Sequence, residues 1–184
     1  MAVVISLLRG VNVGGHHKIK MDALRTLYTD LSLLHVQTCG QSGNAIFRTS
    51  MRDLSALRKR IEKGIESAFG FHSDVILRTT AELREVVARN PFSGRQGLEP
   101  SRFVVEFLAA DPGQEARDKL RALDTAPEEV RIHDRELYIH FPNGMARPKV
   151  PITLIEKILK TSGTARNWNT VRTVLELAEK LESS

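Results

Sequence analysis

A glycine-rich segment near the start of the chain combines cationic side chains with backbone amides, which is chemistry suited to holding an anion. It reads Arg9-Gly10-Val11-Asn12-Val13-Gly14-Gly15-His16-His17-Lys18 and follows an apolar run. Gly10 and Gly15 fit part of a nucleotide-phosphate loop, but the Lys-Ser/Thr pair that such a loop needs does not follow, so we exclude a triphosphatase loop. A looser phosphate or carboxylate cradle stays open, beside a purely structural role for the glycines. The binding residues expected here are Arg9, Asn12, Gly14, Gly15 and Lys18.

Two further segments carry side chains suited to recognising a ligand. The amides of Gln41-Ser42-Gly43-Asn44 can donate and accept hydrogen bonds, although the same residues are ordinary turn formers. Arg166-Asn167-Trp168-Asn169 holds the one tryptophan, which could stack on a planar ligand or fill the core. One of its asparagines is expected to cap the next helix. The binding residues expected here are Gln41, Ser42, Asn44, Arg166, Asn167, Trp168 and Asn169.

No motif for metal binding or covalent catalysis accompanies these segments. His16 and His17 are adjacent, so they point apart on any regular element, and no H-x-x-x-H or C-x-x-C spacing supports a metal site. Cys39 is interpreted as an inert thiol in a strand, and Ser42 is not part of a G-x-S-x-G elbow. We therefore expect no metal and no cofactor, and we assign no catalytic residue.

The spacing of apolar residues predicts the elements that position these segments. Short apolar runs rich in β-branched residues predict strands, and apolar residues three and four apart predict helices. The helix over 54–69 is expected to bury Ala68, and the helix over 80–89 is expected to start at Thr80 without a capping box. The predicted strands are 3–8, 36–41, 45–48, 75–77, 103–108, 130–132 and 137–141, and the predicted helices are 21–31, 54–69, 80–89, 114–123, 152–159 and 169–181.

Each half of the chain follows the order strand, helix, hairpin, helix, so the sequence predicts a repeated pattern. This order favours an α+β fold of two similar ferredoxin-like (βαββαβ-type) subdomains that pack together, with a C-terminal helix. We expect a first subdomain over 1–80, a connecting helix and loop over 81–100, and a second subdomain with the C-terminal helix over 101–184.

The composition is that of a globular protein. Among 184 residues, 41% are hydrophobic and 27% charged, which excludes collagen-like, coiled-coil and disordered chains. A single cysteine excludes an intrachain disulfide, and no apolar run approaches the roughly 20 residues of a membrane span. The first residues lack the features of a secretory signal, so we expect a cytoplasmic protein that is not in a membrane. The net charge is +5, and its excess lies in the first half.

Four ordered motifs resemble those of a known bacterial family. On these residues the chain resembles, over nearly its whole length, the family called domain of unknown function 1697. The resemblance implies two similar ferredoxin-like subdomains and no established activity, substrate or cofactor. The motifs are Leu7 to Gly15, Gln41 to Phe47, Asn90-Pro91-Phe92, and Ala165 to Val171.

Three functions stay open at this point. If the three segments converge between the subdomains, they form one polar pocket for a small anionic or planar ligand, with charge from Arg9, Lys18 and Arg166 and a stacking face from Trp168. Alternatively, the basic first half binds nucleic acid, although aromatic residues make up only 5% of the chain. Finally, the motifs could hold the subdomains of a non-catalytic interaction module together.

Overall fold

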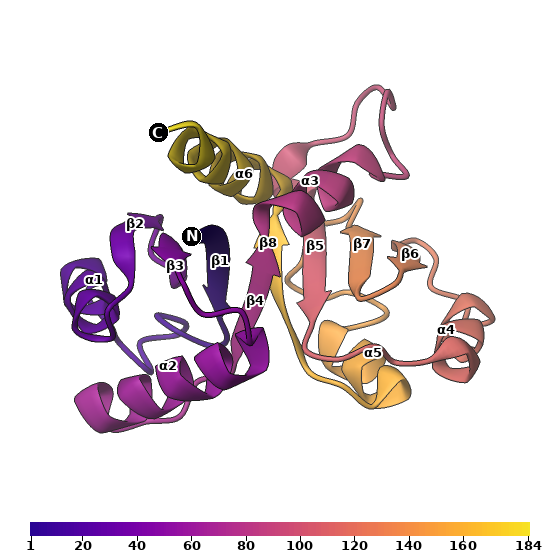
Figure 1. Cartoon of the computed structure of the whole chain (residues 1–184). Coiled ribbons are helices and arrows are strands. Elements are labelled where there is room, and N and C mark those ends of the chain that lie inside the picture. The colour runs from indigo at the N-terminus through magenta and orange to yellow at the C-terminus, as the bar shows by residue number, and fades with distance from the viewer. The chain divides into compact units, whose positions relative to one another are not determined.

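The chain forms two four-stranded antiparallel sheets and six α-helices (Figure 1). The structure is a computed structural model that describes residues 1–184. Contacts divide the chain into unit 1, which is Met1–Glu85 with Arg172–Ser184, and unit 2, which is Val86–Val171. The predicted combination of helices with antiparallel strands is confirmed. The subdomain boundaries predicted at residues 80 and 101 were placed by the repeated order of strands and helices, whereas the two units are defined by spatial contacts. The predicted boundaries therefore stay a prediction.

Unit 1 is a sheet with the strand order β2-β3-β1-β4, and α1 and α2 pack against one of its faces. Alternate residues of the central strand β1, Val4 and Leu8, point to these helices and join a buried core with Phe47, Leu24 and Ile61. The elements are β1 (Ala2–Leu8), α1 (Met21–Asp30), β2 (Leu34–Cys39), β3 (Asn44–Thr49), α2 (Leu54–Phe69) and β4 (Val75–Thr79). The next helix, α3 (Thr80–Ala88), begins in unit 1 and ends in unit 2.

Unit 2 repeats this arrangement with the strand order β6-β7-β5-β8. Val104 and Leu108 of the central strand β5 point to α4 and α5, and they share a buried core with Ile139, Leu120 and Ile155. The elements are the short 3-10 helix η1 (Pro100–Arg102), β5 (Phe103–Leu108), α4 (Gln114–Arg121), β6 (Glu129–His133), β7 (Glu136–His140), α5 (Ile152–Leu159) and β8 (Gly163–Asn167). The last helix, α6 (Trp168–Ser183), begins in unit 2 and belongs to unit 1 from Arg172 onward.

The strand β8 was not predicted from the sequence. It pairs antiparallel with β5, from Val104 opposite Asn167 to Leu108 opposite Gly163. Its sequence, Gly-Thr-Ala-Arg-Asn, lacks the apolar alternation that predicts a strand, so only its pairing with β5 reveals it. Because β8 ends at Asn167, α6 begins at Trp168 instead of the predicted 169.

The start of α3 corrects a second prediction. The Thr79 hydroxyl accepts a hydrogen bond from the Glu82 backbone N–H at 3.2 Å, and the Glu82 carboxylate accepts one from the Thr79 backbone N–H at 2.8 Å. This reciprocal pair is a capping box that begins one residue before the predicted cap, Thr80. The predicted burial of Ala68 is also wrong, because α2 buries Leu57 and Ile65 and leaves Ala68 exposed.

The end of the chain belongs to unit 1 because polar contacts tie it there. The Arg84 guanidinium donates to the carboxylates of Glu179 and Glu182, at 2.8 and 3.3 Å. The Arg48 guanidinium donates to the Leu181 carbonyl oxygen at 2.5 Å. None of the helices is both long enough and apolar enough to cross a membrane.

Candidate functional site

The side chain of Asn12 joins the glycine-rich loop to the hairpin between β2 and β3. Its amide nitrogen donates to the Gln41 carbonyl oxygen at 2.7 Å and to the Ile19 carbonyl oxygen at 2.9 Å. Its oxygen accepts from the Ile19 backbone N–H at 2.9 Å. Asn12 has a positive φ of 56°, a conformation that asparagine tolerates better than most residues. Two of the three predicted segments therefore meet in unit 1.

A cleft of about 480 Å³ lies next to this junction, at the start of α1. We call it the α1 cleft. One wall comes from the first turn of α1 and the other from the end of β2 and its hairpin. Asn12 binds a residue at each wall: Ile19 directly precedes the lining residue Lys20, and Gln41 is itself a lining residue of the second wall. The cleft is lined by Lys20, Met21, Asp22, Arg25, Thr38, Gly40 and Gln41.

The start of α1 leaves backbone donors at the cleft. Lys20 stands at the N-cap position and its side chain makes no capping hydrogen bond. The first N–H groups of a helix have no partner within the helix, and the helix dipole adds positive potential there. Lys20 adds a formal positive charge, so this end of the cleft attracts anions.

Arg25 crosses the cleft from α1 to β2. Its guanidinium donates to the Thr38 hydroxyl at 2.5 Å and forms an ion pair with Asp22, one turn earlier on α1. The Arg25 side chain is 42% exposed and the Asp22 side chain 87% exposed. The Asp22 carboxylate therefore already pairs with the Arg25 guanidinium of the cleft. Because both side chains are exposed, this ion pair is weak.

The other predicted residues of unit 1 stabilise the loop and the hairpin. Asn44 is buried and its amide donates to the Cys39 carbonyl oxygen at 2.8 Å. The Arg9 backbone N–H donates to the Asp74 carbonyl oxygen at 3.0 Å, and its own carbonyl oxygen accepts from the Ser73 hydroxyl at 2.8 Å. The residues that are exposed and outside the α1 cleft are Gly14, Gly15, Lys18 and Ser42.

The third predicted segment lies in unit 2, where its side chains support β8 and α6. The buried Arg166 guanidinium donates to the Thr164 hydroxyl at 2.7 Å, and burial lowers the pKa of Arg166 to about 10. The Asn167 side-chain oxygen accepts from the Thr170 N–H at 2.9 Å, which confirms the predicted helix cap. Trp168 stacks on Phe103 with ring centroids 4.8 Å apart. Asn169 is exposed, and a pocket that joins all three segments stays a prediction.

Sequence reasoning missed Lys20, Arg25 and Thr38 as lining residues of the cleft. One local signal was present: a lysine, which is a poor N-cap, directly precedes the predicted helix 21–31, so the helix start lacks a side-chain acceptor. No local signal placed Arg25 against Thr38, because these residues meet only when α1 packs beside β2.

The structure holds no group of three or more His, Cys, Asp or Glu side chains placed to bind a metal ion. Cys39 lies between the cleft residues Thr38 and Gly40, and burial raises the pKa of its thiol. A raised pKa keeps the sulfur protonated, and the thiol form is a poor nucleophile. The arrangement in unit 1 is therefore suited to binding an anion rather than to covalent chemistry at Cys39.

A family model described as "Protein of unknown function (DUF1697)" matches residues 1–138. The chain belongs to this family. The match covers the first three motifs that carry the resemblance in the sequence and ends before the fourth. The family description names no activity. A search of functionally curated proteins found no match.

A solved structure, that of the conserved bacterial protein SP0830 from Streptococcus pneumoniae, is similar to this chain with a TM-score of 0.74. The sequences are 19% identical, and the similarity covers 97% of this chain and 99% of that one. At this identity the similarity shows the fold alone. The function of the family is thus unknown, as the resemblance implied.

Proposed function

We propose that unit 1 binds a small anionic metabolite through its phosphate or carboxylate group in the α1 cleft. The observation that carries this proposal is the Asn12 side chain, whose three hydrogen bonds hold Ile19 and Gln41 beside the two walls of a cleft lined by Lys20 and Arg25. A loop held in place before binding loses less conformational entropy when the ligand arrives.

The uncapped start of α1 supplies the directional part of the recognition. Backbone N–H groups at Met21 and Asp22 would donate to the anion's oxygens, as at other helix starts that bind phosphate or carboxylate. Lys20 adds charge beside them. The exposed Gln41 side chain, on the opposite wall, supplies an amide that can donate to the ligand or accept from it.

Asp22 sets the strength and selectivity of this site. Its carboxylate already pairs with Arg25, so a ligand oxygen must compete with it for the guanidinium. A phosphate with two negative charges competes better than a monocarboxylate because it brings more charge to Lys20 and Arg25 together. We infer weak binding for free anions and tighter binding for a metabolite that also contacts Gln41.

The residues predicted from sequence divide into two roles under this proposal. Gln41 contacts the ligand, and Asn12 is a positioning residue. The rest of the predicted set in unit 1 shapes the loop and the hairpin that hold these two: Arg9, Gly14, Gly15, Lys18, Ser42 and Asn44. The segment Arg166–Asn169 has a separate role in unit 2.

Amide chemical shifts of the labelled protein, titrated with inorganic phosphate and with malonate, test the proposal. We expect saturable shifts at Met21, Asp22 and Gln41, and about tenfold weaker phosphate binding in Arg25→Gln, because charge-assisted hydrogen bonds contribute about 1.5–3 kcal/mol. Lys18→Gln is the matched control, since it removes one exposed cation of the same loop outside the cleft. Equal weakening in both variants, or shifts without saturation, contradicts the proposal.

Two broader inferences accompany it. We infer that both units belong to the ferredoxin-like class and descend from one duplicated βαββαβ unit, an inference supported by their identical element order and strand order. We also infer a bacterial cytoplasmic protein. The single, protonated cysteine and the Streptococcus pneumoniae relative in fold support this location and source.

A further inference from the structure

We propose that the exposed face of α2 binds the phosphate backbone of single-stranded nucleic acid. Four cations lie on or just before this helix: Arg52, Lys59, Arg60 and Lys63. Residues three and four apart are neighbours on a helix surface, so Lys59, Arg60 and Lys63 form one continuous patch. Arg52 extends the patch past the start of the helix. This surface is separate from the α1 cleft.

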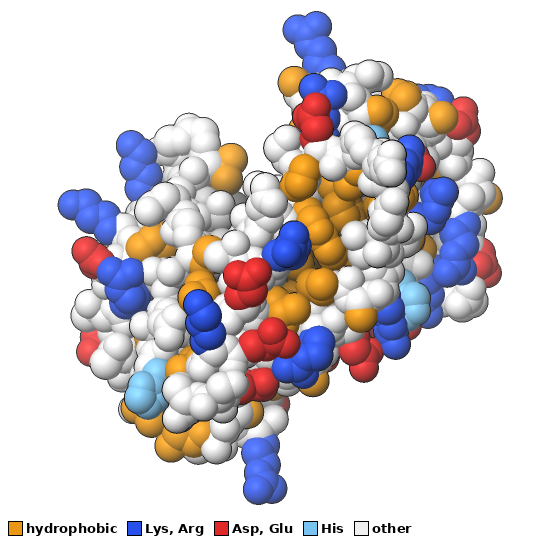
Figure 2. Space-filling model, turned by 90° about the horizontal axis from the view of Figure 1, so that it is seen from above, with side chains coloured by type: hydrophobic (Ala, Val, Ile, Leu, Met, Phe, Trp, Pro, Cys, Tyr) orange, Lys and Arg blue, Asp and Glu red, His pale blue; other side chains and the backbone are white.

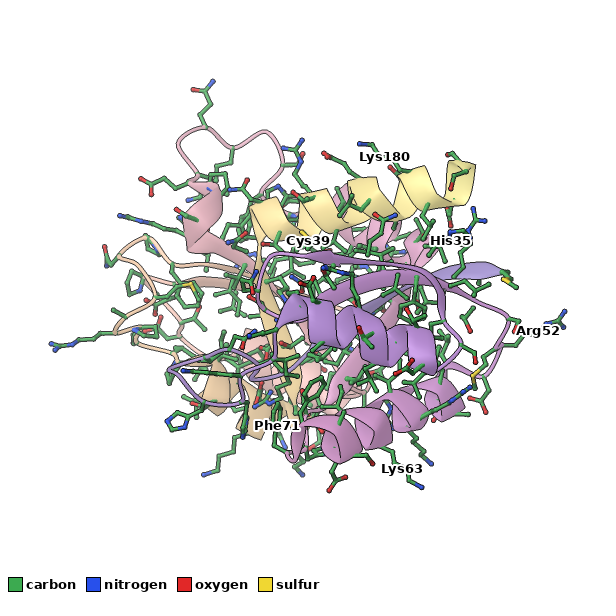
Figure 3. All side chains as sticks on the ribbon, turned by 90° about the vertical axis from the view of Figure 1, so that its left-hand side faces the viewer. His35, Cys39, Arg52, Lys63, Phe71 and Lys180 are labelled. Atoms are coloured by element: carbon green, nitrogen blue, oxygen red, sulfur yellow. The ribbon has the colours of Figure 1, made fainter.

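The cations of this basic face have no carboxylate partner in the structure. The Arg60 guanidinium donates only to the Met51 sulfur, at 3.7 Å. In Figure 3, Arg52 and Lys63 extend outward from the body of unit 1. The nearby acids Asp53 and Glu62 are engaged elsewhere, because Asp53 caps α2 and Glu62 accepts from the Val75 N–H. Four uncompensated cations are therefore available for an external anion.

One acidic residue borders the basic face. Glu66 is exposed and lies one turn beyond Lys63 and two turns beyond Lys59. The Glu66 carboxylate limits the patch to the first three turns of α2, so we predict that removing this carboxylate strengthens binding. The remaining exposed residues of these turns, Ser55 and Ala56, are small and let a phosphate backbone approach closely.

A pair of stacked rings lies just beyond the end of α2. The rings of His17 and Phe71 are 4.4 Å apart and within 9° of parallel. His17 is exposed, and Phe71 follows the helix by two residues, so this ring pair is accessible from solvent near the end of α2. Proteins that bind single strands with little sequence preference combine cationic side chains with aromatic rings, since every base can stack.

The chemistry of this face favours nucleic acid over other polyanions. Helices that bind membrane surfaces carry large apolar side chains next to the cations, and the exposed turns of α2 carry none. An acidic peptide would use the cations but not the stacked rings. The corresponding helix of unit 2, α5, exposes Thr153, Leu154 and Lys157 and has no basic face. Figure 2 gives a contrast to the basic face of α2, because on the face that it draws Lys and Arg side chains are interspersed with Asp and Glu side chains.

Fluorescence anisotropy with labelled single-stranded DNA and RNA of one sequence tests the proposal on the full chain. We expect the logarithm of the affinity to fall with the logarithm of salt concentration with a slope of about −2.8, for four phosphates at about −0.7 each. The triple variant Lys59→Gln, Arg60→Gln, Lys63→Gln should leave a slope of about −0.7 and bind about tenfold more weakly at low salt. His17→Ala should also weaken binding about tenfold through lost stacking.

A matched variant separates the basic face from net charge. Lys119→Gln, Arg131→Gln, Lys157→Gln removes the same charge from exposed positions of unit 2 and should bind like the wild type. Equal weakening by both triple variants overturns the proposal, as does absence of oligonucleotide binding at low salt. Tighter binding to phosphatidylserine vesicles or polyglutamate overturns it in favour of those partners. A preference for RNA or DNA supports it and identifies the natural strand.

Discussion

Unit 1 and unit 2 share one order of strands and helices, which we call the frame, but they differ in the lengths of particular segments. Residues 9–20 join the first strand to the first helix in unit 1, whereas the shorter 109–113 makes this connection in unit 2. The second helix has 16 residues in unit 1 and 8 in unit 2. The basic face lies on the longer second helix, and the α1 cleft lies where the longer connection ends, lined by Lys20 together with residues of α1, β2 and its hairpin.

The frame itself repeats down to single residues. Ile5 lies opposite Arg78 in the first sheet, and Val105 lies opposite Arg166 in the second. Both arginines are buried, and each donates to the carbonyl oxygen of the residue before it, at 2.9 Å. The next position differs, because Ser6 of β1 corresponds to Glu106 of β5. The paired strand positions therefore follow the shared topology, whereas the proposed binding residues lie mainly on the helices and at the end of β2.

The largest expected effect comes from equivalent core leucines, Leu8 and Leu108. Both are 0% exposed, and each ends the central strand of its sheet. Leu8→Ala and Leu108→Ala should each lower the free energy of unfolding by about 2–5 kcal/mol through lost burial and a cavity. Amide hydrogen exchange should show that each variant loses protection mainly in its own unit. Equal loss in both units would mean that they unfold together and would weaken the comparison.

Two glycines test how tightly each frame is packed. A Cβ at Gly43 would lie 2.8 Å from the Leu8 Cβ, and one at Gly163 would lie 2.8 Å from the Phe107 carbonyl oxygen. Gly43→Ala and Gly163→Ala should each cost about 1–3 kcal/mol by overpacking, measured by urea unfolding. Gly15→Ala is the control for strain alone, because its φ is positive but nothing lies within 4 Å of its Cβ. If it costs as much as Gly43→Ala, backbone strain and not packing is the cause.

Asn12 and Asn167 test whether one residue type has different roles in the two units. Asn12→Ala removes three hydrogen bonds, so it should cost about 1–3 kcal/mol and abolish saturable phosphate binding. Asn167→Ala removes one helix cap and should cost about 1 kcal/mol. Phosphate titrations should leave the second variant unchanged. A loss of phosphate binding in Asn167→Ala would show that the third segment takes part in the site.

The smallest effects are pH-dependent and opposite in the two units. In unit 1, a hydrogen bond to Asp74 raises the pKa of His72, so this contribution to stability is present below the ordinary histidine pKa and is lost as pH rises through the raised value. In unit 2, hydrogen bonds from the Gly113 N–H and the Arg117 guanidinium lower the pKa of Asp111. That contribution is present above the ordinary aspartate pKa and is lost as pH falls through the lowered value.

Thermal unfolding across pH checks both contributions. His72→Gln should flatten the slight loss of stability above neutral pH, and Asp111→Asn should flatten the loss in acid. Both groups are exposed, so each change should be small. An NMR titration in which Asp74→Asn leaves the pKa of His72 unchanged would contradict the assigned cause.

Apolar spacing in the sequence predicts most of the helices and strands of both units. Helix 54–69 was predicted with the bounds that the structure has, because its apolar residues recur at helical spacing and report directly on which face is buried. The strand predicted over 103–108 has the bounds of β5, and the strand predicted over 3–8 starts one residue after β1, because short stretches rich in apolar residues also report burial. The predicted cap by one of the two asparagines, which the structure assigns to Asn167, depends on a contact three residues away that the sequence can show.

Which segments meet in space depends on how the elements pack, and the sequence does not show it. β8 has no strand pattern of its own and is ordered by its pairing with β5, far away in sequence. The contacts of Asn12 with Gln41 and of Arg25 with Thr38 join residues whose sequence carries no sign of the other partner. Apolar spacing records burial, which is a local property. Hydrogen bonds between distant segments depend on how the elements pack, so the α1 cleft emerged only from the folded chain.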